Sequence, residues 1–356
     1  MSKAMKSRVS RRRFLAGTGA VAAGLSFMPR RGWSAEEAKI NFYNWDTYIG
    51  ETTLDDFQDV SGIEVKMDLY ADNDELFAKL KEGNPGYDLI VPTNDYVERM
   101  LIADMLEEID RSKITNFGNI DPAFQDSQFD PGRKFSVPYM WGTQGIGYRK
   151  SKVSSPPDSW KVVMESDEYS GRIALLSEGV IGAALMYRGY SYNSVDPAQI
   201  KEVQEMLIKQ KPHIKTFAED NGQDLLLSGE VDLTMEWNGD ILQVMEEDDD
   251  ISYVVPKEGS LVWQDCLCIP KGAPHPENAH KLIDFILDAK VGADIANFIY
   301  YATPNKAARA VMDDDYNLNP AIFPDDATIK KLESAVFLGT DGTRLRDEAW
   351  TRVLAA

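Results

Sequence analysis

Residue types that build common catalytic and metal sites are scarce in this chain of 356 residues. It has two cysteines, Cys266 and Cys268, and three histidines, His213, His275 and His280. The cysteines lie two positions apart on an expected strand, so both point to one face and cannot easily reach disulfide geometry. His275 and His280 are five apart, not the four that places two ligands on one helix face. We therefore predict no metal site and interpret the cysteines as small buried hydrophobic residues.

Motifs of the common enzyme classes are also lacking. The sequence contains no G-x-S-x-G nucleophile elbow and no glycine-rich phosphate loop. Paired carboxylates could in principle do acid–base work. An exported enzyme therefore stays open as an alternative, whereas the prediction is a protein that is not an enzyme and needs no cofactor.

Positive charge is in short supply, with 38 basic residues against 58 acidic ones and a net charge of −20. Phosphate binding needs clustered Lys and Arg, so nucleic acid is not expected as a partner. An acidic surface attracts cations, although many proteins are acidic for solubility alone. The acidic run 246–250 is interpreted as a solvated loop, because it lacks the glycine and the twelfth-position glutamate of an EF-hand.

The first 35 residues have the form of an export signal. Basic residues precede an apolar stretch, 14–28, which is short and rich in Gly and Ala for a membrane span, and small residues follow near Ala35. Residues 10–15 (SRRRFL) resemble a twin-arginine signal, the alternative being an ordinary signal with surplus arginines. With cleavage expected after Ala35, the remainder has 30 basic and 58 acidic residues and a net charge of −28. A periplasmic protein is predicted.

Short strands alternate with helices after the signal. This alternation predicts a parallel sheet covered by helices, with ligands beyond the carboxyl ends of the strands. Five polar or aromatic residues lie where an expected strand passes to a helix: Trp45, Asp46, Tyr48, Thr93 and Asp95. The expected strands are 40–44, 64–70 and 87–92, with helices at 54–60, after a cap at 72–74, and after a cap at 93–95.

Two extended runs, 135–149 and 251–270, separate this pattern from a second strand–helix series. Two crossovers between two α/β halves describe hinged lobes with a cleft between them. The predicted boundaries are 36–145 plus 264–310 for lobe 1, and 146–263 plus 311–356 for lobe 2.

Aromatic residues lie close to acids at three expected strand positions. Trp263 and Asp265 share one face of a strand. Trp237 precedes Asp240 by three residues, at the end of the strand 231–236, and Trp45 to Tyr48 form the third group. Each alone is more typical of core packing. Together they suit an organic cation, because carboxylates bind ammonium groups and aromatic faces attract them by cation–π interaction.

Seven stretches, in order, resemble the spermidine/putrescine-binding family of periplasmic proteins. The resemblance implies a type II periplasmic binding fold, capture of a polyamine, delivery to an ABC importer permease in the inner membrane, and a monomer. The stretches are FYNWDTYIG, YDLIVPTNDYV, IDRSKITNFGNIDP, FSVPYMWGTQGIGY, GEVDLTMEWNGD, VPKEGSLVWQDCLCIP and YYATPNKAAR.

The resemblance assigns roles to residues at matching positions. Trp45, Tyr48 and Tyr301 match aromatics that line the cleft, and Trp237 and Trp263 match tryptophans that sandwich the ligand. Thr93 matches a ligand-contacting hydroxyl residue, Asp265 the carboxylate that grips an amine, and Asp240 an acid of the putrescine-type branch. With Asp46, Asp95 and Glu178, the complete expected site is Trp45, Asp46, Tyr48, Thr93, Asp95, Glu178, Trp237, Asp240, Trp263, Asp265 and Tyr301.

Four positions depart from the family pattern. Gly179 falls where a glutamate is expected, with Glu178 as the nearest substitute, and Asp95 stands where the spermidine branch has an aromatic. Ala335 replaces an amide-bearing residue and Glu219 a serine. These departures leave open another cation, such as agmatine, a guanidine or an amino-acid-derived amine, and a role as a sensor that signals to a membrane receptor.

Overall fold

A parallel three-stranded sheet is formed by the first strands of the computed structural model, which describes residues 36–356. The order is β2-β1-β3, and Phe42 at its centre pairs with Met67 on one side and Leu89 on the other. A helix follows each strand, as the alternation predicts. The elements are β1 (Lys39–Asn44), α1 (Thr53–Ser61), β2 (Glu64–Leu69), α2 (Asn73–Lys81), β3 (Leu89–Ile90) and α3 (Asn94–Ile102). The predicted signal, residues 1–35, lies outside the described residues.

Local chemistry sets where these helices begin. The Asp72 carboxylate accepts a hydrogen bond from the backbone N–H of Glu75 at 2.7 Å, so the predicted cap of α2 is confirmed. Thr93 also precedes its helix, but its hydroxyl donates to the Asp95 carboxylate (2.9 Å) and does not cap the helix backbone. The predicted start of this helix is therefore confirmed, with Thr93 at the N-cap position, but no side-chain hydrogen bond caps its backbone.

A larger mixed sheet is built from the rest of the chain, in the order β10-β9-β4-β7-β5-β6, with β8 paired to β4. β5 is parallel to β6 and β7, whereas β4 is antiparallel to β7, β8 and β9. The strands are β4 (Val137–Arg149), β5 (Ile173–Leu176), β6 (Ile214–Ala218), β7 (Leu233–Trp237), β8 (Ile251–Val254), β9 (Leu261–Leu267) and β10 (Glu333–Ser334).

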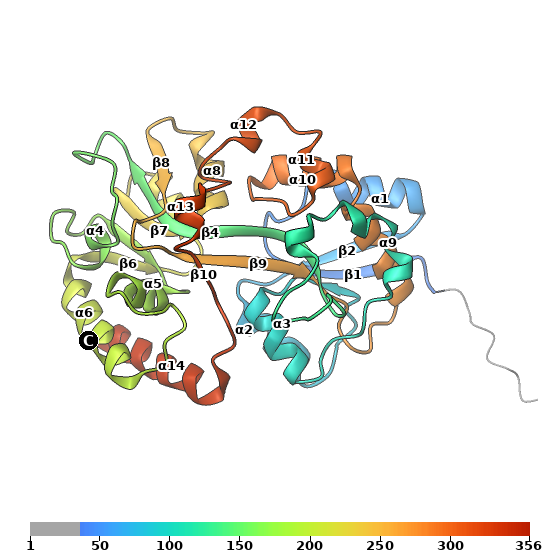
Figure 1. Cartoon of the computed structure of the whole chain (residues 1–356), viewed down its shortest axis with the longest axis horizontal. Coiled ribbons are helices and arrows are strands. Elements are labelled where there is room, and N and C mark those ends of the chain that lie inside the picture. The colour runs from blue at the N-terminus through green and yellow to red at the C-terminus, as the bar shows by residue number, and fades with distance from the viewer. Residues whose placement is uncertain (1–35) are drawn as a thin grey trace, which may run out of the picture. The chain divides into compact units, whose positions relative to one another are not determined.

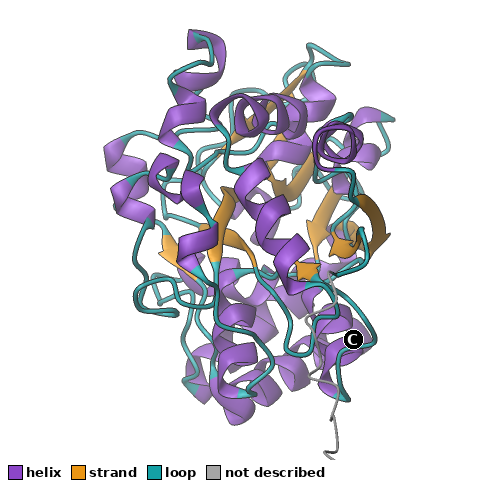
Figure 2. Ribbon diagram, turned by 90° about the vertical axis from the view of Figure 1, so that its right-hand side faces the viewer, coloured by secondary structure: helices purple, strands orange, loops and turns teal. Residues whose placement is uncertain are grey.

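Helices surround both sheets, as the view in Figure 2 shows. None of the helices in residues 36–356 has the length and apolar character needed to cross a membrane. The remaining helices are α4 (Lys161–Met164), α5 (Val180–Tyr187), α6 (Pro197–Gln210), α7 (Gly222–Leu227), α8 (Asn238–Met245), α9 (Pro276–Ile286), α10 (Ala289–Ile299), α11 (Lys306–Arg309), α12 (Asp314–Asn317), α13 (Asp326–Ile329) and α14 (Gly339–Ala355), with short 3-10 turns at Arg111–Lys113, Thr115–Asn119, Pro122–Phe124 and Lys211–His213.

Two long strands, β4 and β9, run side by side through the middle of the molecule (Figure 1). The extended run predicted over 135–149 is β4. The run predicted over 251–270 is wrong as one segment, since a turn at residues 255–260 divides it into β8 and β9. Pro256 has no N–H for a ladder, and Gly259 turns the chain with a φ of 105°. Residues 36–356 pack as one compact unit, so the two-lobe boundaries stay a prediction.

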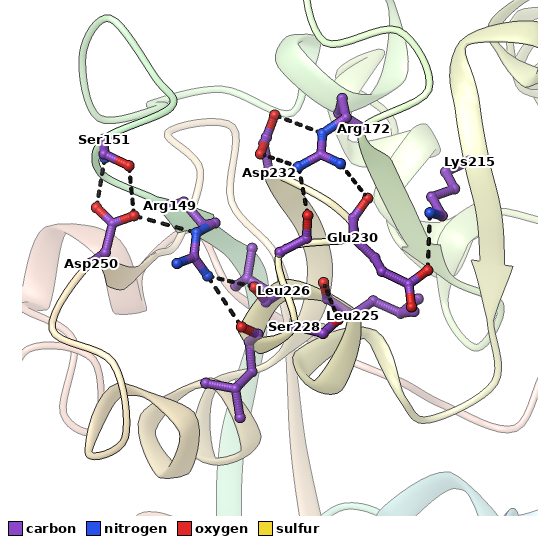
Figure 3. Close-up of polar contacts among 12 residues, drawn as sticks. Arg149, Ser151, Arg172, Lys215, Leu225, Leu226, Ser228, Glu230, Asp232 and Asp250 are labelled. Atoms are coloured by element: carbon purple, nitrogen blue, oxygen red, sulfur yellow. Dashed lines mark hydrogen bonds and ion pairs between the residues drawn. The ribbon is translucent and has the colours of Figure 1, made fainter.

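The acidic run 246–250 forms the predicted loop between α8 and β8, but part of it is paired. Arg149, at the end of β4, lies 2.7 Å from the Asp248 carboxylate and 3.3 Å from that of Asp250. Asp250 also accepts hydrogen bonds from the backbone and hydroxyl of Ser151, and Figure 3 shows Asp250 between Arg149 and Ser151. Part of this acidic loop is therefore fastened to β4.

The two cysteines are confirmed as free and buried. Both belong to the hydrophobic core between the parallel sheet and helices α2 and α3, which contribute residues such as Leu76 and Met100. The side chain between them in sequence, Leu267, belongs to the core on the other face. The strand therefore alternates as its period of two predicts.

Candidate functional site

A single cavity of about 980 Å³ brings together all the residues that the sequence predicted for the site. Its walls come from both sheets and from the C-terminal segment. The eleven predicted residues that line it are Trp45, Asp46, Tyr48, Thr93, Asp95, Glu178, Trp237, Asp240, Trp263, Asp265 and Tyr301.

Strand ends place most of these side chains. Trp45 follows β1, Glu178 follows β5, and Trp237 is the last residue of β7. Thr93 and Asp95 stand at the start of α3, and Asp240 lies in the first turn of α8. The rule that ligands lie beyond strand carboxyl ends thus accounts for the convergence.

The parallel sheet and the larger sheet are bonded to each other where β9 passes α3. Thr93 and Asp265 form an antiparallel bridge, and the amide of Asn94 accepts from the backbone N–H of Gln264 at 3.0 Å. Gln264 turns away from the cavity toward the Arg133 guanidinium, whereas Trp263 and Asp265 face the cavity. The predicted shared face of Trp263 and Asp265 is therefore confirmed.

Aromatic rings form a continuous series along the cavity. Trp263 lies edge to face with Trp237 (ring centroids 6.1 Å apart) and with Tyr301 (5.0 Å), and Tyr301 with Tyr48 (5.5 Å). Trp45 packs against Tyr70 at 4.6 Å, and its indole N–H donates to the carbonyl of Val91. Edge-to-face contacts hold such rings in fixed orientations and leave faces available to a ligand.

Six residues of the cavity wall carry a buried polar atom that has no hydrogen-bond partner of good geometry among the described residues: Tyr48, Asn73, Gln223, Trp263, Asp265 and Arg346. The Tyr48 hydroxyl and the Asp265 Oδ1 belong to side chains that are each 5% exposed and lie next to each other. Leaving such groups unsatisfied is costly, about 1–3 kcal/mol each and more for a charge. A ligand that donates a hydrogen bond to the Asp265 carboxylate would remove this free-energy cost.

Burial and mutual repulsion raise the pKa of several carboxyl groups of the cavity. Loss of hydration, followed by the charge of Asp95, raises the pKa of Asp265 to about 8. Burial, followed by the charge of Asp220, raises the pKa of Asp240 to about 8. Enclosure by protein and the nearby Asp95 also raise the pKa of Glu178, although solvent in the cavity reaches this side chain. A bound cation would reverse these shifts.

Acids far outnumber bases among the lining residues, where Arg99 and Arg346 are the two bases. Arg99 pairs with Asp74 at 2.9 Å, and the Arg346 guanidinium donates to backbone carbonyls of residues 192 and 194. Twelve acids line the cavity: Asp46, Asp72, Asp74, Asp95, Glu178, Glu219, Asp220, Asp224, Asp240, Glu247, Asp265 and Asp347.

Sequence reasoning found Asp240 but missed two further carboxylates that lie beside it. One oxygen each of Asp220, Glu236 and Asp240 lie within 4.8 Å of one another, close enough to hold a metal ion. Asp220 follows β6, so the strand-end rule applied to that strand could have found it. Nothing in the sequence around Glu236 indicates a site residue, since it lies within the strand β7 and not at its end.

Apart from Ala335, which departs from the family pattern, the C-terminal segment was not predicted to reach the site. Residues 335–338 and Arg346 of α14 line the cavity. The Asn94 amide donates to the carbonyl of Ala335 at 2.6 Å, and the backbone N–H of Phe337 donates to Glu98 at 2.9 Å. Local sequence patterns do not predict such long-range contacts. Ala335, one of the four departures, thus does stand at the cavity.

The loop that carries Glu178 explains why glycine follows it. Gly179 has a φ of 80°, and a Cβ there would lie 2.8 Å from the Tyr192 hydroxyl and 2.9 Å from the Gln144 amide. The Gln144 side chain donates to the carbonyl of Glu178 at 3.0 Å. A glutamate at 179 would not fit this geometry, so Glu178 supplies the acid of this loop.

The arrangement as a whole can bind an organic cation. Carboxylates provide acceptors, ring faces attract cations, and the walls between them are apolar enough for methylene groups. Among the described residues we find no serine or cysteine paired with a base that would activate it in this cavity.

Comparison with known proteins agrees with this chemistry. Residues 52–324 match the model of the bacterial extracellular solute-binding protein family. The chain is 37% identical to the spermidine/putrescine-binding periplasmic protein of Escherichia coli, over 90% of this chain and 92% of that one. It is 30% identical to the E. coli putrescine-binding periplasmic protein PotF, over 94% and 96%. The chain belongs to the spermidine/putrescine-binding family of bacterial extracellular solute-binding proteins.

Solved structures of this family share its fold. The spermidine/putrescine ABC transporter substrate-binding protein PotD of Streptococcus pneumoniae superposes with a TM-score of 0.79 at 32% identity, covering 89% of this chain and 98% of that one. The predicted periplasmic binding fold is therefore confirmed. Membership of this family places the chain among solute-binding components of transporters and not among enzymes.

Proposed function

We propose that this protein captures a polyamine in the cavity between its sheets and delivers it to an ABC importer. The observation that carries the proposal is the unpartnered Oδ1 of the buried Asp265, set beside a series of aromatic rings. An ammonium group would donate to that oxygen, and the attached methylenes would lie against Trp263 and Tyr301. The named E. coli relatives bind spermidine or putrescine, which is the same chemistry.

Export to the periplasm completes the proposal. The relatives are periplasmic proteins, and residues 1–35 have the sequence of an export signal, with arginines that suit the twin-arginine route. In the periplasm the protein would act as a monomer and dock on a permease in the inner membrane. Ligand binding would select a closed population of the two predicted lobes.

A different organic cation is the second candidate. Glu178 in place of the family glutamate at 179, and Asp95 in place of an aromatic, give this cavity acids at positions of its own. A relative from Pseudomonas aeruginosa, 31% identical, is a putrescine/agmatine-binding protein. Agmatine carries a guanidinium at one end, which prefers paired carboxylate oxygens in one plane.

Fluorescence titration distinguishes these candidates. Trp45, Trp237 and Trp263 line the cavity, so a bound ligand should quench tryptophan emission. We expect saturation by putrescine or spermidine at micromolar concentration, about −8 kcal/mol of binding free energy. Saturation by agmatine alone would favour the second candidate. No change with any polyamine or with agmatine would contradict both.

A further inference from the structure

Two aromatic rings of the cavity wall, those of Tyr301 and Trp263, each lie across a glycine behind the wall. A Cβ built on Gly239 would lie within 2.6 Å of three atoms of the Tyr301 ring. A Cβ built on Gly142 would lie 2.5 Å from Cζ2 of Trp263. Carbon atoms that are not bonded to each other pack at about 3.5–4.0 Å. Any larger residue at either position would therefore displace the ring.

Gly239 is the second residue of α8, where glycine brings no advantage to the helix itself. Glycine weakens a helix relative to alanine, because it loses more backbone freedom on folding. Gly239 also lacks the positive φ that would favour glycine. The contact with the Tyr301 ring is the feature of the structure that requires a residue without a Cβ at this position.

The backbone at Tyr301 is held by hydrogen bonds to other elements. The Tyr301 carbonyl accepts from the hydroxyl of Tyr316 at 2.6 Å. The next residue, Ala302, exchanges two backbone hydrogen bonds with Trp141 of β4, at 2.9 and 3.2 Å. A Cβ at position 239 would therefore turn the Tyr301 ring and leave its backbone in place.

The orientation of the Tyr301 ring matters because other residues of the site lie against it. Its centroid is 5.0 Å from that of Trp263 and 5.5 Å from that of Tyr48, and its hydroxyl lies next to Asp240. Tyr301 is 4% exposed, so the space into which its ring could turn is the cavity. A turned ring would occupy part of the space for the ligand and separate the hydroxyl from Asp240.

Gly142 has the same relationship to Trp263, its direct partner in the ladder between β4 and β9. Neighbouring strands lie about 4.8 Å apart, so β9 and β7, on either side of β4, are separated by roughly 10 Å. The ring centroids of Trp263 on β9 and Trp237 on β7 are nevertheless 6.1 Å apart. The Trp263 ring reaches over β4, and it does so at Gly142. The amide of Asn238, which accepts from the backbone N–H of Thr143 at 3.0 Å, closes the other side of this space.

We propose that Gly239 and Gly142 are positioning residues for ligand binding, which hold the rings of Tyr301 and Trp263 in the orientation that the ligand meets. The proposal rests on polyamine binding as the function of the cavity. It adds two residues that lie behind the wall and act on the ligand through the rings alone.

Calorimetric titration with spermidine, in proteins with and without a ring at position 301, tests the role of Gly239. We expect Gly239→Ala to lower the affinity at least tenfold in the unchanged protein and in Tyr301→Phe, which keeps the ring. In Tyr301→Val, whose own affinity is lower, the same change should alter the affinity less than twofold, because no ring is left to displace. Gly118→Ala is the matched control, since a Cβ at that exposed position meets no atom of residues 36–356 within 4 Å beyond its chain neighbours.

Thermal melts without ligand give a second readout. Gly239→Ala should lower the Tm of the unchanged protein but raise that of Tyr301→Val by about 1–2 °C, because alanine then stabilises the helix without a clash. Losses of equal size with and without the ring, in affinity or in Tm, would overturn the proposal. Should Gly239→Ala fail to fold, folding restored by Tyr301→Val would support the proposal, and folding that is not restored would overturn it.

Near-ultraviolet circular dichroism tests the role of Gly142, because the signal of a tryptophan depends on the orientation of its ring. Gly142→Ala should change the spectrum, and Trp263→Phe should remove most of that change. A change of equal size in Trp263→Phe would overturn the role of Gly142. The melts and the spectra need no ligand, so they decide these positions even where the unchanged protein binds no spermidine, a result that would contradict the proposed function alone.

Discussion

The indole rings of Trp237 and Trp263 meet edge to face, with centroids 6.1 Å apart and planes at 81°. Trp237 is the last residue of β7, and Trp263 lies on β9. Strand β4 lies between these two strands and pairs with both. The sheet therefore fixes the distance between two aromatic walls of the cavity. Ligand affinity should depend on these rings as aromatic surfaces and not merely as bulk.

Replacing Trp237 by leucine should weaken polyamine binding, whereas phenylalanine should largely preserve it. A cation–π contact contributes about 0.5–2 kcal/mol, which corresponds to a loss of roughly 2- to 30-fold in affinity. Calorimetric titration measures the loss. Trp141→Leu is the matched control, since Trp141 packs against Phe124 and Phe323 outside the cavity. Equal losses for leucine and phenylalanine at 237 would show that the indole acts only by filling space.

Glu178→Gln tests whether this chain has replaced the family acid by its neighbour. The change keeps the size of the side chain and removes its charge, so the Gln144 bond to the backbone of residue 178 should survive. We expect affinity to fall by about tenfold, as for a lost charge-assisted contact of 1.5 kcal/mol or so. Glu219→Gln, at the cavity edge after β6, serves as the comparison. If the two variants bind alike, Glu178 has no special role.

Binding should release protons near pH 7. Carboxyls such as Asp265 and Asp240, whose pKa is raised to about 8 in the unliganded protein, are then partly protonated. A bound cation stabilises the ionised form and lowers these pKa values, so affinity should rise as pH increases from 5.5 to 8.5. Calorimetry in two buffers of different ionisation enthalpy gives the number of protons. Proton uptake, or affinity that falls over this range, would contradict the account.

Stability without ligand should have the opposite pH dependence. Between the unfolded carboxyl pKa near 4 and the folded value of about 8, the native state binds more protons than the unfolded one. This contribution to the free energy of unfolding is therefore present at pH 5 and lost as pH rises toward 8. Thermal melts should show a higher Tm for the unliganded protein near pH 5.5 than near pH 8, and Asp265→Asn should reduce the difference. A Tm independent of pH in both proteins would argue that these carboxyls are ionised throughout.

Much of the parallel sheet and the cavity could be predicted from sequence, because both depend on local patterns. The alternation of strands and helices predicted that Trp45 and Thr93 lie at strand ends. The two-residue period of side chains along a strand predicted that Trp263 and Asp265 lie on one face of their strand. The break between β8 and β9 also has a local signal in the sequence, because Pro256 and Gly259 interrupt the extended run.

The rest depended on contacts between distant segments. Glu236 shares a strand face with Thr234 and reads as a polar surface residue, yet α7 begins against that face at Gly222 and buries it. Residues 335–338 are held at the cavity by hydrogen bonds to α3 and to Asn193. Neither arrangement leaves a periodic signal, since each is set by tertiary packing.

The central claim, that Asp265 binds an ammonium group of the ligand, is tested most directly by calorimetric titration of the unchanged protein and of Asp265→Asn with spermidine. The account predicts micromolar affinity for the unchanged protein and a loss of at least tenfold in the variant, about 1.4 kcal/mol or more. Equal affinity in the two proteins would contradict it.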